Sequence, residues 1–421
     1  MLILTIFAML CLLLVMYMIS RDFLYPPVIF TGVWLISLVG VLLSGDLFYE
    51  LYGTALLVYL IGAIAFSVGG VLGFWLMCGN TKHAQIGTSN AYSRRAIYRF
   101  LDVVLIVLVT GLPLYWREIS SGVSNVNTEL MLYTIRHNEV EASGSAGSFN
   151  LINNFGGLAQ FLALVMFYEI DGSFERSWRA IISVVLAIVY GAMTGTKGGV
   201  VILLLTLYFI SAIKGRRFRV LPLLGTIGLA LFGFAVGVVV INLTFESYAS
   251  TGVMLSEIAD QILTYWLGGI VAFQRIAENP NAIESTQPIY RFFLETAHSL
   301  GINVKVPSIH ADYTMIGPSI NGNVYTIYFT YFKDWGWFGT VIIMLVLGMG
   351  LTFLYKRAMQ GKTIAVLFYA MMLVGLVISF NGEHFFLGLN GYIKAFIFFY
   401  VVYQLVPNMA RKPYWKWEGH V

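Results

Sequence analysis

Charged residues are scarce in this chain. Only 11% of the residues are Asp, Glu, Lys or Arg, whereas 58% are hydrophobic. A typical soluble protein has about twice that charged fraction. So little charge across 421 residues excludes a string of water-soluble domains and predicts a polytopic membrane protein. The net charge of +4 is small, and it does not indicate nucleic acid as a partner.

Cysteines and several catalytic signatures are also scarce or missing. Cys11, inside the first span, and Cys78, at the end of the third, are the two cysteines, and we interpret both as buried small apolar residues and not as a disulfide or metal pair. No HExxH, Gly-x-Ser-x-Gly or CxxC occurs, so zinc protease and serine hydrolase chemistry lack support. An Asp-x-Asp signature is absent as well, and we expect neither a metal nor another cofactor.

Long continuous apolar runs are what the sequence does have. A membrane β-barrel would alternate at every second residue, so the runs predict helices. The expected fold is an all-α polytopic transmembrane helical bundle of about 11 spans. Their predicted ranges are 2–19, 28–43, 53–77, 101–116, 151–168, 180–193, 200–213, 220–241, 338–355, 364–380 and 391–406.

The basic residues predict the orientation of these spans. Seventeen of the 25 Lys and Arg residues lie in alternate links and in the C-terminal tail. Because cytoplasmic links carry the excess of basic residues, we expect the N-terminus outside and the C-terminus in the cytoplasm. Residues 1–421 then form a single integral membrane domain, and residues 242–337 form one long extracytoplasmic loop with short helices between spans 8 and 9.

The long loop contains two predicted helices. In residues 289–300, Arg291, Glu295 and His298 share one face at i, i+4 and i+7. They form either a solvated ion pair or a polar face turned into a cavity, where Arg291 holds an anion. Upstream, residues 255–273 have an apolar and a polar side, as expected of a helix lying flat on the membrane, and Arg275 follows them.

A glycine-rich turn separates two short predicted spans. Thr194-Gly-Thr-Lys-Gly-Gly199 has the backbone N–H groups, the helix N-terminus and the Lys197 charge that suit an anion such as a lipid phosphate. Its spacing does not match a Walker A loop. The alternative is a tight helical hairpin whose Lys197 reaches the headgroups.

An aromatic run closes the long loop at residues 321–337. It represents either an interfacial belt or a surface on which sugars stack. Asn321 and Asn323 suit hydroxyl recognition better than a belt. Tyr325 and Asp334 lie in the same run.

The last outer turn and span add three candidates. Glu383 or His384 in Asn381-Gly-Glu-His-Phe385 is placed to take a proton from a hydroxyl, with a capping or packing role as the alternative. Lys394 lies one turn into the last span, where an ionisable group is a functional candidate unless it only snorkels. Arg136 in the second-longest outer loop completes the set of outward cations.

Together these features resemble the oligosaccharide repeat-unit polymerases, the O-antigen (Wzy-type) polymerases of bacterial inner membranes. The resemblance lies in the order of spans and in three motifs. These motifs are the Thr-Gly-Thr-Lys-Gly turn, where Lys197 stands in place of the usual arginine, Gly268-Gly269-Ile-Val-Ala-Phe273, and Asn323-Val-Tyr-Thr-Ile-Tyr with Asp334-Trp-Gly-Trp-Phe-Gly339. It covers most of the chain in architecture and is specific in residues in the last two motifs.

The resemblance implies a glycosyltransferase reaction on the periplasmic face. A growing glycan on undecaprenyl pyrophosphate would be transferred to the non-reducing sugar of an incoming lipid-linked repeat unit. The implied partners are undecaprenyl-pyrophosphate-linked oligosaccharides, membrane lipids and a chain-length regulator. Because the leaving group is already a pyrophosphate, cations and a base would suffice for this step.

We therefore assign roles to ten residues. Arg291 has a part in catalysis beside Glu383 or His384, one of which is the base. Pyrophosphate would bind to Lys197, Arg275, Arg291, Arg136 and Lys394. Sugar would bind to Asn323, Tyr325 and Asp334.

Three other functions fit parts of the pattern. An O-antigen ligase would use the same donor with a lipid A–core acceptor. A flippase or transporter for lipid-linked sugars would show paired repeats and broken midplane helices, and we find neither. A structural scaffold would leave the outward cations unexplained.

Overall fold

A computed structural model describes residues 1–77, 91–120, 154–170, 174–193, 197–242, 258–284, 286–307, 311–318 and 320–411 of the chain. The regular secondary structure of the described residues is helical, apart from one two-stranded antiparallel hairpin. The helices before the long loop are α1 (Leu2–Ser20), α2 (Pro26–Leu43), α3 (Gly53–Leu76), α4 (Ala91–Ser120), α6 (Phe155–Tyr168), α7 (Phe174–Met193), α8 (Lys197–Gly215) and α9 (Val220–Asn242). After the loop come α13 (Ile327–Met359), α14 (Thr363–Val377), α15 (Leu389–Tyr400), η7 (Val401–Leu405) and α16 (Val406–Arg411).

Every predicted span overlaps one of these helices. Within the described ranges, seven helices are long and apolar enough to cross a membrane. Four further apolar helices are shorter, namely Phe155–Tyr168, Ser177–Met193, Val220–Gly233 and Thr363–Val377. The helical character expected from the composition is therefore confirmed, and the seven candidate spans are typical of a multi-pass membrane protein. Cys11 differs from its prediction, because its side chain is exposed on the outer surface of α1 and not buried.

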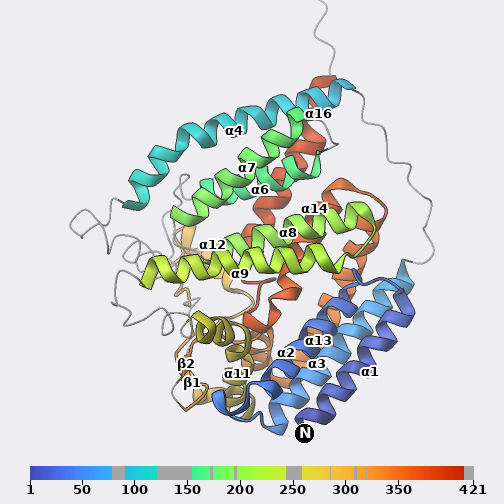
Figure 1. Cartoon of the computed structure of the whole chain (residues 1–421), viewed down its shortest axis with the longest axis vertical. Helices are drawn as coiled ribbons and strands as arrows, with labels where there is room; N and C mark the ends of the chain where they lie inside the picture. Colours follow the sequence, from blue (N-terminus) through green and yellow to red (C-terminus); the bar gives the residue numbers. More distant parts are fainter. Residues whose placement is uncertain are drawn as a thin grey trace, which may run out of the picture.

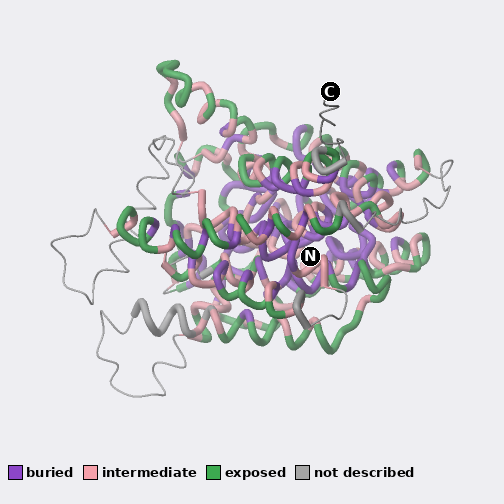
Figure 2. Tube along the Cα trace, turned by 90° about the horizontal axis from the view of Figure 1, so that it is seen from above, coloured by how far each residue is buried: buried purple, intermediate pink, exposed green. Residues whose placement is uncertain are grey.

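The helices are arranged in two groups. Figure 1 shows α1, α2, α3 and α13 bundled in the lower part of the molecule, with α4, α6, α7, α8 and α9 layered above them. Viewed from above, the buried positions are concentrated in the centre and the exposed positions follow the periphery (Figure 2). Many Leu, Ile and Val side chains are exposed on the outer surface of the apolar helices, as is typical of membrane proteins, in which lipid contacts such side chains.

Helices α3 and α13 approach each other more closely than side chains would allow. A methyl group on Gly69 of α3 would lie 2.0 Å from the Leu345 carbonyl oxygen, and one on Gly348 of α13 would lie 2.0 Å from the Phe66 carbonyl oxygen. Small residues at helix contacts are the usual route to close packing in membranes, where the hydrophobic effect does not drive helices together. This pair forms the centre of the lower bundle.

Helix α13 is bent at Gly336, whose φ of 59° and ψ of −152° are not helical. This region of backbone space is accessible essentially to glycine alone. The predicted start of span nine at residue 338 coincides with the bend. The preceding segment, from Ile327, is already helical, and Tyr328, Phe329 and Tyr331 are fully buried there. The aromatic run thus contributes mostly to the core, while Trp335 and Trp337 stay exposed.

The described part of the long loop is helical at both predicted places. Residues 258–263 are helical and continue through a π-helical turn, η4 (Thr264–Gly268), into α11 (Gly269–Glu278), which is followed by the short η5 (Pro280–Ala282). Helix α12 (Arg291–Ser299) confirms the helix predicted at 289–300. Unlike a helix lying flat on a membrane, α11 is largely buried, and Tyr59 of α3 donates a hydrogen bond of 2.6 Å to the Ile270 carbonyl.

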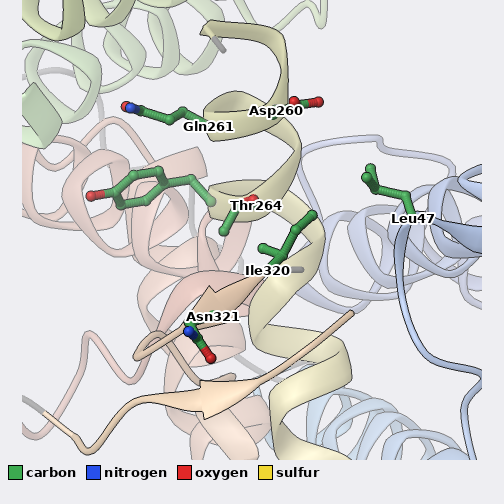
Figure 3. A pocket seen from close by; sticks show the side chains of 7 residues that line it. Leu47, Asp260, Gln261, Thr264, Ile320 and Asn321 are labelled. Atoms are coloured by element: carbon green, nitrogen blue, oxygen red, sulfur yellow. The ribbon is translucent and has the colours of Figure 1, made fainter. Parts of the chain in front are cut away.

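Strands β1 (Thr314–Met315) and β2 (Asn321–Gly322) form the hairpin. Figure 3 shows it beside the helix that carries Asp260, Gln261 and Thr264. Two adjacent glycines let other segments pack closely on this helix, one against the hairpin and the other against the turn before α15. A methyl group on Gly268 would lie 2.8 Å from Ile316 Cδ1, and one on Gly269 would lie 2.6 Å from the Phe380 carbonyl oxygen. The Gly268-Gly269 pair therefore lets the hairpin and the turn before α15 pack directly on this helix.

Candidate functional site

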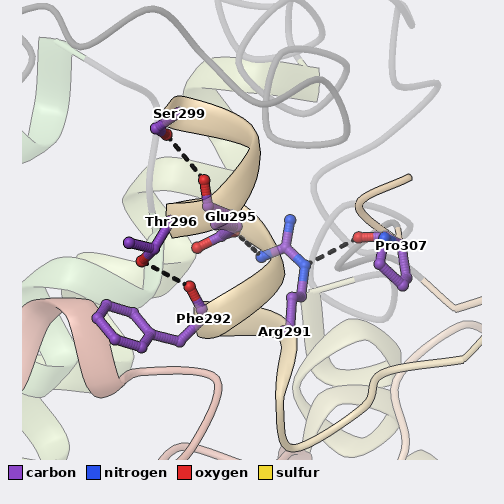
Figure 4. A network of polar contacts seen from close by, with 6 residues as sticks. All are labelled: Arg291, Phe292, Glu295, Thr296, Ser299 and Pro307. Atoms are coloured by element: carbon purple, nitrogen blue, oxygen red, sulfur yellow. Dashed lines mark hydrogen bonds and ion pairs between the residues drawn. The ribbon is translucent and has the colours of Figure 1, made fainter. Parts of the chain in front are cut away.

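Arg291 lies at the first position of α12 and is only 3% exposed. Its Nη1 pairs with Glu295 one turn later, and its Nε donates a hydrogen bond of 2.8 Å to the Pro307 carbonyl (Figure 4). Burial lowers the pKa of the guanidinium, and the Glu295 carboxylate opposes that shift. The burial of Arg291 differs from the predicted solvated ion pair, while the alternative, in which Arg291 holds an anion in a cavity, stays a prediction.

Lys394 on α15 belongs to the same group of side chains. Its Nζ donates a hydrogen bond of 2.7 Å to Asn154 Oδ1, immediately before α6. The Glu295 carboxylate interacts electrostatically with the Lys394 ammonium. We name Arg291, Glu295, Lys394 and Asn154 the cation cluster. It holds two positive charges and one negative charge on α12 and α15, and Asn154 joins Lys394 to the N-terminal end of α6, which adds its partial positive charge.

Arg275 has other partners. It is exposed on α11, and its Nη1 donates a hydrogen bond of 3.1 Å to Thr314 Oγ1 on the hairpin. Its charge also acts on Tyr325, a predicted sugar-binding residue. Tyr325 is 3% exposed and donates its hydroxyl proton to the Asp312 carbonyl at 3.0 Å. Burial, reinforced by Asp312, raises the Tyr325 pKa, and Arg275 opposes the shift.

The remaining sugar-binding candidates lie near this second group. Asn323 is half-buried between β2 and α13, and Asp334 is exposed on α13. Lys333, next to Asp334, donates to the Ile283 carbonyl and interacts electrostatically with Asp312, Glu284 and Asp334. Arg275 therefore bonds to the hairpin, and Lys333 interacts with Asp312, which lies two residues before β1.

The predicted pyrophosphate-binding residues thus fall into two groups. Figure 1 shows α11 low in the molecule beside the hairpin and α12 higher, at the level of α9. Lys394, and not Arg275, shares an acid with Arg291. Lys197 begins α8, but its side chain lies outside the described residues, as does the whole of Arg136. Among the described side chains, Arg291 is therefore grouped with Lys394, whereas a common pyrophosphate site of Lys197, Arg275 and Arg291 stays a prediction.

Glu383 is 4% exposed and accepts four hydrogen bonds. Its Oε1 accepts from the Tyr331 hydroxyl and the Phe385 N–H, both at 2.8 Å, and its Oε2 accepts from the Phe386 N–H at 2.8 Å and the Leu387 N–H at 2.7 Å. Three backbone donors and one hydroxyl occupy the carboxylate. This arrangement matches the capping role left open above, in which Glu383 fixes the turn before α15.

His384, the next residue, has one ring nitrogen without a hydrogen-bond partner among the described residues. Its ring makes a backbone hydrogen bond with Ile378, while Nε2 is buried and has no hydrogen-bond partner among the residues that the structure describes. Burial lowers the His384 pKa to about 4, so the ring is neutral at pH 7. His384 keeps a nitrogen without a hydrogen-bond partner in the described part of the chain, whereas the Glu383 carboxylate is occupied, so His384 stays a candidate for the base.

The depressed pKa of His384 predicts a pH-dependent stability. The unfolded chain takes up a proton at this residue near pH 6.5 and the folded protein only near pH 4. Stability contributed by the neutral ring is therefore complete above about pH 6.5 and lost as pH falls toward 4. Thermal unfolding of purified protein in detergent should show this loss, and His384→Gln should reduce it. An unchanged pH dependence in that variant contradicts the buried, neutral state of His384.

Only one of the residues that contact the candidate side chains could be recognised from the local sequence. Glu295 is recognisable from its i, i+4 spacing to Arg291. Asn154 and Tyr331 have no local signal, because their partners are 240 and 52 residues away in sequence. No group of three or more His, Cys, Asp or Glu side chains with metal-binding geometry occurs in the described ranges.

Comparisons with protein-family models, curated proteins and solved structures find no match to this chain.

Proposed function

We propose that the protein is an inner-membrane polysaccharide polymerase. It transfers a growing glycan from undecaprenyl pyrophosphate to the non-reducing end of an incoming lipid-linked repeat unit, as in O-antigen or capsule assembly. The proposed topology has 11 spans, an outward N-terminus and a cytoplasmic C-terminus, with the site on the periplasmic face. Support comes from the resemblance of the three motifs and from the basic residues of alternate links.

The cation cluster is the observation that carries this proposal. Arg291 and Lys394 bring two positive charges to one acid, and Lys394 lies on a helix that is apolar enough to span a membrane. A charged group in such a helix is costly and marks a functional site by default. Two cations beside an apolar helix suit a ligand with an anionic head and a lipid tail. A lipid pyrophosphate is such a ligand.

The reaction requires few groups. A hydroxyl oxygen of the acceptor sugar forms a bond to the anomeric carbon of the donor glycan, and the bond from that carbon to the pyrophosphate oxygen breaks. His384 Nε2 accepts the hydroxyl proton. Arg291 and Lys394 stabilise the negative charge that the departing pyrophosphate gains, which is usually the largest contribution to such catalysis. His384 precedes α15 and Lys394 lies within it, so one helix positions both roles.

The polymerase is tested by purifying the full chain, reconstituting it in liposomes and adding synthetic undecaprenyl-pyrophosphate-linked repeat units. We expect a ladder of products spaced by one repeat unit. A single transfer, seen only when lipid A–core is supplied, would identify a ligase. Movement of the lipid across the bilayer without any change in mass would identify a flippase. Either of these results, or no reaction, overturns the polymerase.

A further inference from the structure

A cavity of about 410 Å³ lies beside the hairpin and away from the cation cluster. It opens between Leu47, at the end of the short helical turn η1 (Gly45–Leu47), the helix of residues 258–263 with the start of η4, and the approach to β2. Its lining consists of Leu47, Asp260, Gln261, Thr264, Tyr265, Ile320 and Asn321 (Figure 3). Its volume is in the range of small-molecule sites, about 300–1,000 Å³.

The lining has the composition of a sugar-binding surface. Gln261 and Asn321 supply amide groups that both donate and accept, and Thr264 supplies a hydroxyl. Sugar hydroxyls need such mixed partners, while the C–H faces of the ring pack on apolar or aromatic groups. Tyr265, which is 42% exposed, and Ile320 provide those groups.

The formal charge in the described part of the lining indicates which ligands fit. Asp260 is an exposed acid, and neither lysine nor arginine is among the described lining residues. A phosphate or a uronic acid in the cavity would face this carboxylate, and no described residue of the lining would compensate the repulsion with a positive charge. A neutral sugar would meet no such repulsion, and an amino sugar would gain an attractive charge.

The walls of the cavity are held by tight packing. Thr264 begins the π-helical turn η4, a local distortion that occurs frequently at functional sites. A methyl group on Gly268, at the end of the same turn, would lie 2.8 Å from Ile316 Cδ1, and one on Gly322 would lie 3.1 Å from the same atom. Asn321 pairs with Met315 in the hairpin, whose neighbouring residue Thr314 accepts the hydrogen bond from Arg275. The hairpin and the helical segment 258–278 thus contribute both to the cavity and to the surroundings of the exposed Arg275.

We propose that this cavity binds an uncharged or amino-substituted sugar unit of the polysaccharide, through Asp260, Thr264 and Asn321. The identity of that sugar as part of a glycan substrate rests on the proposed function. Saccharide binding itself does not, because it requires neither lipid nor donor. The cavity would therefore select against repeat units that place an acidic sugar at this position.

The test measures saccharide binding to the full-length protein in lipid nanodiscs by saturation-transfer difference NMR. The probes are maltotriose as a neutral trimer, a glucosamine trimer with free amines, and trigalacturonate as an acidic trimer. Wild-type protein should bind the glucosamine trimer at least about fivefold more tightly than trigalacturonate. Asp260→Asn should close most of that gap, and Thr264→Val and Asn321→Ala should weaken binding of maltotriose and of the glucosamine trimer.

Glu278→Gln is the matched control, because it removes an exposed carboxylate from the same helical segment outside the cavity. It should keep the wild-type preference. No saturable binding of any probe to the wild-type protein, or equal preferences in wild type and Asp260→Asn, overturns the inference. A normal ladder without saccharide binding overturns only the assignment of this cavity. Intact saccharide binding without a ladder contradicts the polymerase and leaves the cavity's role standing.

Discussion

Replacing Arg291 by alanine is expected to shorten the polysaccharide product to one or a few repeat units. Loss of one charge-assisted contact to the departing pyrophosphate should raise the barrier by about 2–4 kcal/mol, or about 30- to 1,000-fold in rate. The readout is the ladder formed by reconstituted protein at matched amounts of folded enzyme. Arg291→Lys keeps the charge but loses the planar fork of donors, so it should recover only part of the activity.

The burial of Arg291 makes its control essential. Because Arg291 pairs with Glu295, its removal also leaves a carboxylate beside Lys394. Glu295→Ala removes the same ion pair and leaves the cation in place. If Arg291 binds pyrophosphate, Glu295→Ala should retain most of the polymerising activity. Equal losses in Arg291→Ala and Glu295→Ala, or a wild-type ladder from Arg291→Ala, would show that the ion pair serves the fold alone.

Replacing Glu383 by glutamine should lower stability as well as activity. In the wild-type protein, four donors bond to the two carboxylate oxygens of Glu383. A glutamine side chain offers a single acceptor oxygen, and its NH₂ group would face donors in place of the second oxygen. Each buried donor left unpaired costs about 1–3 kcal/mol, so we expect a loss of about 2–4 kcal/mol in the free energy of unfolding. Thermal unfolding in detergent measures this loss.

Glu50→Gln provides the comparison, because Glu50 is an exposed acid outside this turn, and its replacement should leave the unfolding temperature unchanged. A Glu383→Gln protein that unfolds at the wild-type temperature but forms no ladder would restore Glu383 as the base. Assayed separately, His384→Ala should abolish the ladder. Normal polymerisation by both variants would remove this turn from the chemistry.

Much of the helical architecture could be predicted from the sequence. Helix formation depends on hydrogen bonds between residues four positions apart, so a continuous apolar run of sufficient length indicates a membrane helix by itself. The amphipathic spacing of Arg291 and Glu295 likewise indicated α12. The bend at Gly336 lay within two residues of the predicted start of its span, although the backbone angles that cause it were not predictable.

The sequence by itself determined that the chain is helical, with several helices apolar enough to cross a membrane, and that Arg291, Lys394, Glu383 and His384 are candidates. Only the tertiary structure decided their partners. Lys394 interacts with Asn154 and Glu295, and Arg275 donates a hydrogen bond to the hairpin. The Glu383 carboxylate accepts hydrogen bonds from four donors. Such contacts join residues far apart in the chain, so they depend on how all the helices pack and leave no local pattern.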